Sequence, residues 1–296
     1  MTENYTMKGI KKNDKIKALF FNEIDNTVRE PEEFFINNGE SPKINKISKN
    51  KDVTYQYNSL GFRSDEFTKN HDGEHVLFAG CSETEGVGGN LDSCWSYMTY
   101  CELSKEGNLS GFFNLSRYGW GYDIIIQNIM CYINEYGKPK KIFILFPNLG
   151  RFYTWDGNEE GFEDFVHRGH IPNSVIDYSE KSNWKRKINA EEQRSQFIIF
   201  TMILKLFEEY CISNDIKLSW STWDKEDTEN YLNANIFKNF LPMPELKDFI
   251  KNNSEYFLKE IRPRVDWDKK RDGHCGYAYH SLWADSFLGK LEGKKD

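Results

Sequence analysis

The sequence lacks the features that mark several common classes of protein. No uninterrupted apolar run reaches the about 18 residues that a membrane-spanning helix needs. Residues 1–17 carry no apolar core of signal-peptide length. Basic residues are not in excess, because 39 Lys and Arg stand against 46 Asp and Glu. These absences predict a cytoplasmic protein that binds neither membranes nor nucleic acids. They leave association with a virus particle open.

Motifs for metals and cofactors are also missing. The six cysteines form no Cys-x-x-Cys pair and have no histidine partners at zinc spacing. No glycine-rich loop carries the lysine of a phosphate-binding loop or the glycine spacing of a dinucleotide-binding loop. We therefore expect reduced thiols, no metal and no organic cofactor.

Aromatic residues are abundant, with 22 Phe, 16 Tyr and 8 Trp to fill a core. Short apolar runs alternate with helical patterns, which is typical of a parallel sheet covered by helices on both faces. We expect strands at 76–80, 111–115, 141–146 and 216–220, and helices at 94–103, 122–135, 191–213 and 278–291. The helix at 191–213 is apolar nearly all round, which predicts deep packing.

Three polar stretches do not fit this alternation. Residues 1–70 are predicted to be an N-terminal extension to an α/β domain at 71–296, and 149–190 and 224–271 to be insertions within that domain. Ligands bind at the carboxyl ends of strands in open α/β sheets, so insertions there would shape a substrate pocket.

A serine directly follows the first predicted strand, within residues 80–86 (GCSETEG). Small residues allow a sharp turn, and a serine at a helix start would have an exposed hydroxyl and a free N–H. Ser82 therefore occupies the position of an attacking nucleophile. Cys81 is expected to be an apolar filler beneath the loop, and Glu83 and Glu85 to be solvated loop carboxylates.

Three further segments carry polar residues at corresponding places. Residues 114–121 (NLSRYGWG) follow the second strand, 146–148 (FPN) follow the third, and 272–274 (DGH) precede the last helix. Together with residues 80–86, they resemble the four blocks of the SGNH, or GDSL-like, hydrolase family. The resemblance implies a three-layer α/β/α sandwich of SGNH-hydrolase type, with a mostly parallel, flavodoxin-like sheet.

The resemblance also implies a role for each matching residue. Ser82 matches the nucleophile and His274 the catalytic base. The oxyanion hole would consist of the N–H groups of Ser82 and Gly119 and the side-chain amide of Asn148. Asp272 is the candidate to orient His274, although it stands two residues before the histidine and the family's aspartate stands three before. The family's Gly-Asp-Ser is here Gly-Cys-Ser.

Further candidates lie outside the four blocks. Residues 57–66 resemble a stretch that precedes the nucleophile strand in some members. Arg63 within them either pairs with an acid or contacts the substrate, or it is a surface arginine in a plain turn. Tyr153 and Trp155, in the first insertion, either stack on sugar rings or belong to its core. His280, inside the last predicted helix, is expected to be structural.

The expected function is that of a serine esterase, which forms an acyl-enzyme and hydrolyses it with activated water. The substrate would be a small-molecule or glycan ester, with a carbohydrate O-acetyl group preferred. The alternative is an SGNH-like domain with weak or no catalysis that binds a glycan or serves as a structural protein.

Overall fold

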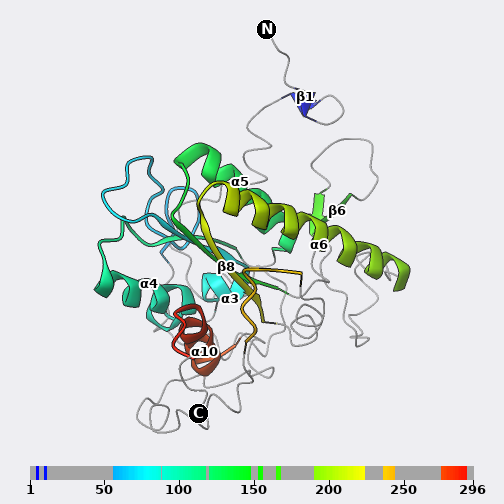
Figure 1. The fold of residues 1–296 in the computed structure, drawn as a ribbon. Coiled ribbons are helices and arrows are strands. Elements are labelled where there is room, and N and C mark those ends of the chain that lie inside the picture. The colour runs from blue at the N-terminus through cyan, green and yellow to red at the C-terminus, as the bar shows by residue number, and fades with distance from the viewer. Residues whose placement is uncertain are drawn as a thin grey trace, which may run out of the picture.

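The protein is built around a four-stranded, all-parallel sheet (Figure 1). The computed structural model describes residues 5–6, 10–11, 56–87, 89–117, 120–147, 153–155, 165–167, 190–223, 236–243 and 275–291. The strands are β3 (Val76–Gly80), β4 (Phe113–Ser116), β5 (Lys141–Phe146) and β8 (Lys217–Thr222). Their order across the sheet is β4-β3-β5-β8, so β3, the first of these four strands along the chain, lies between the second and the third. The predicted α/β fold with flavodoxin-like strand order is confirmed.

The register of the sheet aligns the carboxyl ends of its strands. Gly80 at the end of β3 pairs with Ser116 on β4 and with Leu145 on β5, and Leu145 in turn pairs with Ser221 on β8. β3 is buried along its whole length, as a central strand covered on both faces must be. Residues that follow these strand ends therefore emerge at one edge of the sheet.

Helices cover both faces of the sheet and form three layers (Figure 1). α5 (Tyr122–Tyr136) and α6 (Ala190–Ser213) pack on one face, and α4 (Trp95–Glu106) and α10 (Tyr277–Phe287) pack on the other. The short elements α3 (Ser82–Glu85) and η1 (Leu91–Ser93) precede α4. Because side chains alternate along a strand, β3 contributes Leu77 and Ala79 to the α5–α6 core and Val76 and Phe78 to the other.

The packing of α6 corrects one expectation. The helix buries Phe200, Leu204 and Phe207, which recur at helical spacing. The prediction of deep packing is wrong, because a group of five apolar residues of this helix is between 46% and 69% exposed: Ile198, Ile199, Met202, Leu206 and Ile212. A helix on one face of a sheet can bury only one stripe, and the apolar sequence of α6 is wider than that stripe.

Short strands and bridges lie within the polar stretches. β1 (Tyr5–Thr6) pairs with β2 (Ile10–Lys11), and β6 (Tyr153–Trp155) pairs with β7 (Phe165–His167), both antiparallel. From residues 224–271, Phe240 forms a parallel bridge to Trp220 on β8. Phe62, within residues 1–70, is fully buried in the α5–α6 core.

Across the described ranges, no helix is long and apolar enough to cross a bilayer.

Candidate functional site

A tight turn joins β3 to α3, and two glycines make it possible. A Cβ on Gly80 would lie 2.0 Å from Thr84 Oγ1 and 2.7 Å from the carbonyl oxygen of Leu145. Gly86 ends α3 in the left-handed region at φ 78°, and a Cβ there would lie 1.8 Å from Cys94 Sγ. Only glycine fits at either position, so the sequence fixes a compact strand–turn–helix around Ser82.

Ser82 is the first residue of α3. Its N–H has no carbonyl within the helix to bond, as expected for an oxyanion donor. Its hydroxyl lies 3.9 Å from Cys81 Sγ, and Cys81 is fully buried as predicted. The expectation of an exposed hydroxyl is wrong, because Ser82 is only 4% exposed and all four residues of α3 are buried.

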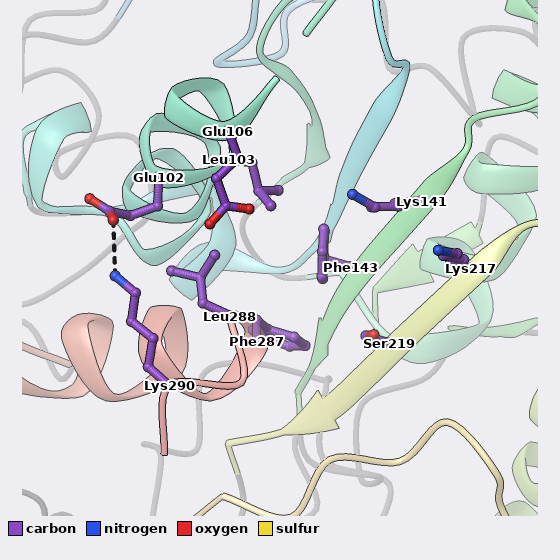
Figure 2. A pocket seen from close by; sticks show the side chains of 10 residues that line it. All are labelled: Glu102, Leu103, Glu106, Lys141, Phe143, Lys217, Ser219, Phe287, Leu288 and Lys290. Atoms are coloured by element: carbon purple, nitrogen blue, oxygen red, sulfur yellow. Dashed lines mark hydrogen bonds and ion pairs between the residues drawn. The ribbon is translucent and has the colours of Figure 1, made fainter. Parts of the chain in front are cut away.

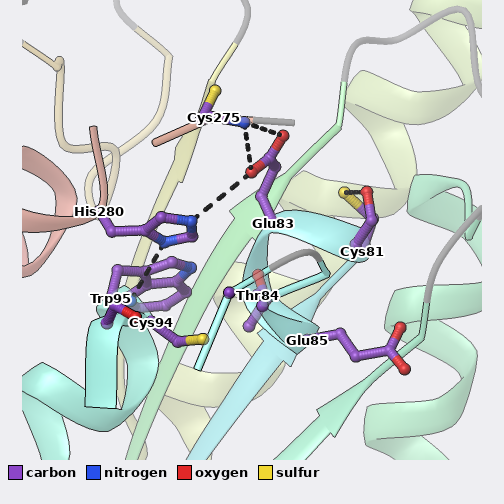
Figure 3. Close-up of polar contacts among 12 residues, drawn as sticks. Cys81, Glu83, Thr84, Glu85, Cys94, Trp95, Cys275 and His280 are labelled. Atoms are coloured by element: carbon purple, nitrogen blue, oxygen red, sulfur yellow. Dashed lines mark hydrogen bonds and ion pairs between the residues drawn. The ribbon is translucent and has the colours of Figure 1, made fainter. Parts of the chain in front are cut away.

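Glu83 is a buried carboxylate, which corrects the prediction that it is solvated. It is 2% exposed and accepts the backbone N–H of Cys275 at 3.2 and 3.3 Å to its two oxygens. Nε2 of His280 lies 3.8 Å from the same carboxylate (Figure 3). Nδ1 of His280 accepts the N–H of Trp95 at 3.2 Å, so this buried histidine links α10 to the start of α4. His280 lies inside α10, as predicted, and its structural role stays a prediction.

Glu85 is also buried, on the opposite side of α3. Figure 3 shows its side chain pointing away from that of Glu83. It accepts the Tyr57 hydroxyl at 3.1 Å. The prediction of a solvated carboxylate is therefore wrong here too. α3 has only four residues, between a buried strand and a glycine turn, and no face of this helix is exposed to solvent. The shortness of the helix is the sequence signal that could have predicted the burial of its carboxylates.

Arg63 braces the turn that follows α3. Its Nη1 donates to the carbonyl oxygens of Glu85, Gly86 and Gly89 at 3.3, 2.9 and 3.0 Å. The side chain is buried, so the surface-arginine interpretation is wrong. A direct contact between Arg63 and substrate stays a prediction.

The end of β4 is tied to the same short helix. Nδ2 of Asn114 and Oγ of Ser96 both donate to the carbonyl oxygen of Thr84, each at 3.1 Å. Ser116 Oγ donates to Asn114 Oδ1 at 2.6 Å. Beyond the strand, Arg117 donates to the carbonyl oxygen of Gly61. Its guanidinium carbon lies 5.6 Å from the centre of the Tyr57 ring.

Four of the predicted site residues lie outside the described residues: Gly119, Asn148, Asp272 and His274. For three of them, the structure describes residues that are close in sequence. β4 ends three residues before Gly119, β5 ends two residues before Asn148, and Cys275 follows His274 directly. Tyr153 and Trp155 are the first and last residues of β6, and a contact of either with a sugar stays a prediction.

Cys94 is a second nucleophilic side chain beside this turn. Burial raises the pKa of its thiol to about 11, against the opposing effect of the Arg63 charge. The thiol is therefore neutral at physiological pH and a poor nucleophile. Within the described ranges, no group of three or more His, Cys, Asp or Glu side chains could hold a metal ion.

A cavity of about 330 Å³ lies at the other edge of the sheet (Figure 2). Its lining includes Lys141 and Lys217, the first residues of β5 and β8, and the apolar side chains of Phe143 and Phe287. The carboxyl ends of the strands, where Ser82 lies, are at the opposite edge. This cavity is therefore separate from the candidate site.

No family model matches the chain, and no curated protein is similar to it. The SGNH resemblance therefore rests on the four blocks of residues themselves.

Proposed function

We propose that the protein is a serine esterase of the SGNH type, with Ser82 as nucleophile and His274 as base. The observation that carries this proposal is the hydrogen bond from the N–H of Cys275 to Glu83. It joins the residue after His274 to the residue after Ser82, although 192 positions separate the bonded pair. A chain segment from the far end of the sequence thus reaches the nucleophile turn.

The reaction follows from the groups that this edge of the sheet would bring together. Ser82 Oγ attacks the ester carbonyl while His274 takes its proton, and Asp272 holds the imidazole in the required tautomer. The tetrahedral oxyanion is stabilised by the N–H groups of Ser82 and Gly119 and the amide of Asn148. His274 then protonates the leaving alcohol and activates the water that releases the acid.

The neighbouring strand ends support this set of oxyanion donors. β3 lies between β4 and β5 in the sheet, and its last residue, Gly80, pairs with the last residue of β4 and with the second-to-last residue of β5. Ser82, Gly119 and Asn148 each follow one of these strands within three residues. Such an arrangement can supply three donors to one oxygen atom without a metal or an organic cofactor.

The proposed substrate is an acylated carbohydrate, with an O-acetyl group as the bond that is cleaved. Tyr153 and Trp155 follow β5 in the chain, and aromatic rings are the side chains that stack on sugars. Arg63 is a further candidate contact.

A second candidate function is glycan binding or a structural role without strong catalysis. The 4% exposure of Ser82 favours it, because a nucleophile must be reached by its substrate. The two candidates differ in whether Ser82 is activated.

Labelling with a fluorophosphonate tests for an activated serine without knowledge of the substrate. We expect the purified protein to be modified at Ser82, as located by peptide mass spectrometry. Ser82→Ala removes the hydroxyl that is labelled and should abolish labelling at that site, and His274→Ala should lower its rate by at least about 1,000-fold. Ser219→Ala, at the opposite edge of the sheet, is the matched control and should label as the wild type does.

Absence of labelling in folded wild-type protein would contradict the esterase proposal and favour the binding role. If labelling occurs, acetylated sugars are the first esters to assay. Release of acetate by the wild type and not by Ser82→Ala would support the substrate class.

A further inference from the structure

Glu83 carries a carboxyl group in the protein interior, where an ionised group is energetically unfavourable. A carboxylate that is 2% exposed has lost nearly all its hydration, and burial of an ionised group is unfavourable unless partners replace the water. The described partners are the Cys275 N–H, which bonds both oxygens, and the His280 ring at 3.8 Å. These described contacts tie the carboxylate to the segment that enters α10.

His280 reinforces this link from the helix side. Its Nδ1 accepts the Trp95 N–H, so in the neutral ring the proton is on Nε2, which faces Glu83. Glu83 thus contacts α10 at the residue before its Gly276 N-cap and at one residue in its second turn. One contact just before α10 and one within it fix the orientation of this helix as well as its distance from α3.

We propose that Glu83 is a positioning residue, which holds the start of α10 so that His274 is placed against Ser82. This inference rests on the proposed function and adds a residue that neither the four blocks nor their resemblance assigns a role. The short chain path gives the mechanism: Glu83 directly follows the nucleophile, and Cys275 directly follows the base. Loss of the carboxylate frees the Cys275 N–H and allows the histidine to drift from the hydroxyl.

The test measures the rate of fluorophosphonate labelling at Ser82 per folded molecule. Because a misplacement of about 1 Å can cost about 100-fold, we expect Glu83→Ala to lower this rate by about 10- to 100-fold. Glu83→Gln keeps an oxygen that can accept the Cys275 N–H and should stay within about 3-fold of the wild type. Hydrogen exchange at the Cys275 amide should accelerate in Glu83→Ala and remain slow in Glu83→Gln.

Glu208 provides the matched control for a buried carboxylate. It lies on α6, is fully buried, and accepts the Asn239 N–H and the Trp220 indole N–H, each at 3.0 Å. Glu208→Ala should lower the melting temperature, as Glu83→Ala does, without a change in the labelling rate of the folded protein. This comparison separates positioning from a general loss of stability.

Each outcome has one meaning. If the wild type labels at Ser82 and Glu83→Ala labels equally fast, Glu83 is only structural and this inference is overturned while the esterase proposal stands. An equal loss of rate in Glu208→Ala would also overturn it. If folded wild-type protein does not label, the proposed function fails and this inference fails with it.

Discussion

Arg63 illustrates how much a single buried side chain can stabilise the nucleophile turn. Its guanidinium donates to three backbone carbonyl oxygens, those of Glu85, Gly86 and Gly89, and the Gly86 oxygen also accepts the Gly89 N–H. We expect Arg63→Ala to lower the free energy of unfolding by about 3 kcal/mol or more, since hydrogen bonds from charged groups contribute about 1.5–3 kcal/mol each and do not add fully. Denaturant unfolding measures this change.

The control for Arg63 is a basic side chain in an ion pair on the protein surface. Lys69 pairs with Glu135 at 3.2 Å, and its side chain is 66% exposed. Lys69→Ala should change stability by less than about 1 kcal/mol. Similar losses in the two variants would contradict the bracing role of Arg63.

At the scale of elements, the two faces of α6 contribute very differently to the free energy of unfolding. Leu204 is fully buried and Leu206 is 69% exposed, two positions further along the same helix. Leu204→Ala should cost about 2–5 kcal/mol, whereas Leu206→Gln should cost less than about 0.5 kcal/mol because glutamine keeps the helix propensity. Thermal or denaturant unfolding of both variants makes the comparison. A large loss in Leu206→Gln would mean that this face is covered.

The elements were largely predictable from sequence because their apolar patterns are unambiguous. Strands 76–80 and 141–146 were predicted to the residue, since each is a continuous apolar run with clear ends. The strand predicted at 111–115 lies at Phe113–Ser116, because polar Asn114 and Ser116 continue it. The last predicted helix, 278–291, ends earlier at Phe287, where the chain turns toward Gly289 at φ 70°.

The partners within the site were not predictable, and the reason is distance along the chain. The pattern around Ser82 indicates a turn, but it contains no sign that Glu83 meets Cys275 and His280 or that Glu85 meets Tyr57. A carboxylate in isolation is more often solvated, and only the tertiary fold brings a partner to it. Local patterns thus identified the strand ends and not the contacts between them.

At the scale of the whole molecule, one buried histidine should make stability depend on pH. His75 precedes β3, bonds the Tyr132 hydroxyl of α5 at 2.7 Å and stacks on His71 with ring centres 3.7 Å apart. Burial, with a smaller contribution from the His71 charge, lowers the pKa of His75 from 6.5 to about 4. The folded protein therefore binds this proton less readily than the unfolded chain does.

The sign of the effect follows from that difference in proton binding. Between pH 6.5 and about 4 the unfolded chain holds the proton and the folded protein does not, so the free energy of unfolding falls as the pH falls. The contribution of His75 has a slope of at most about 1.4 kcal/mol per pH unit, which falls to about half at pH 6.5 and approaches zero about one pH unit higher. His75→Phe removes the titrating group, so denaturant unfolding from pH 7.5 to 4.5 should show a shallower acid loss than in the wild type. Parallel profiles for the two proteins would mean that His75 is not the group that couples the β3–α5 packing to pH.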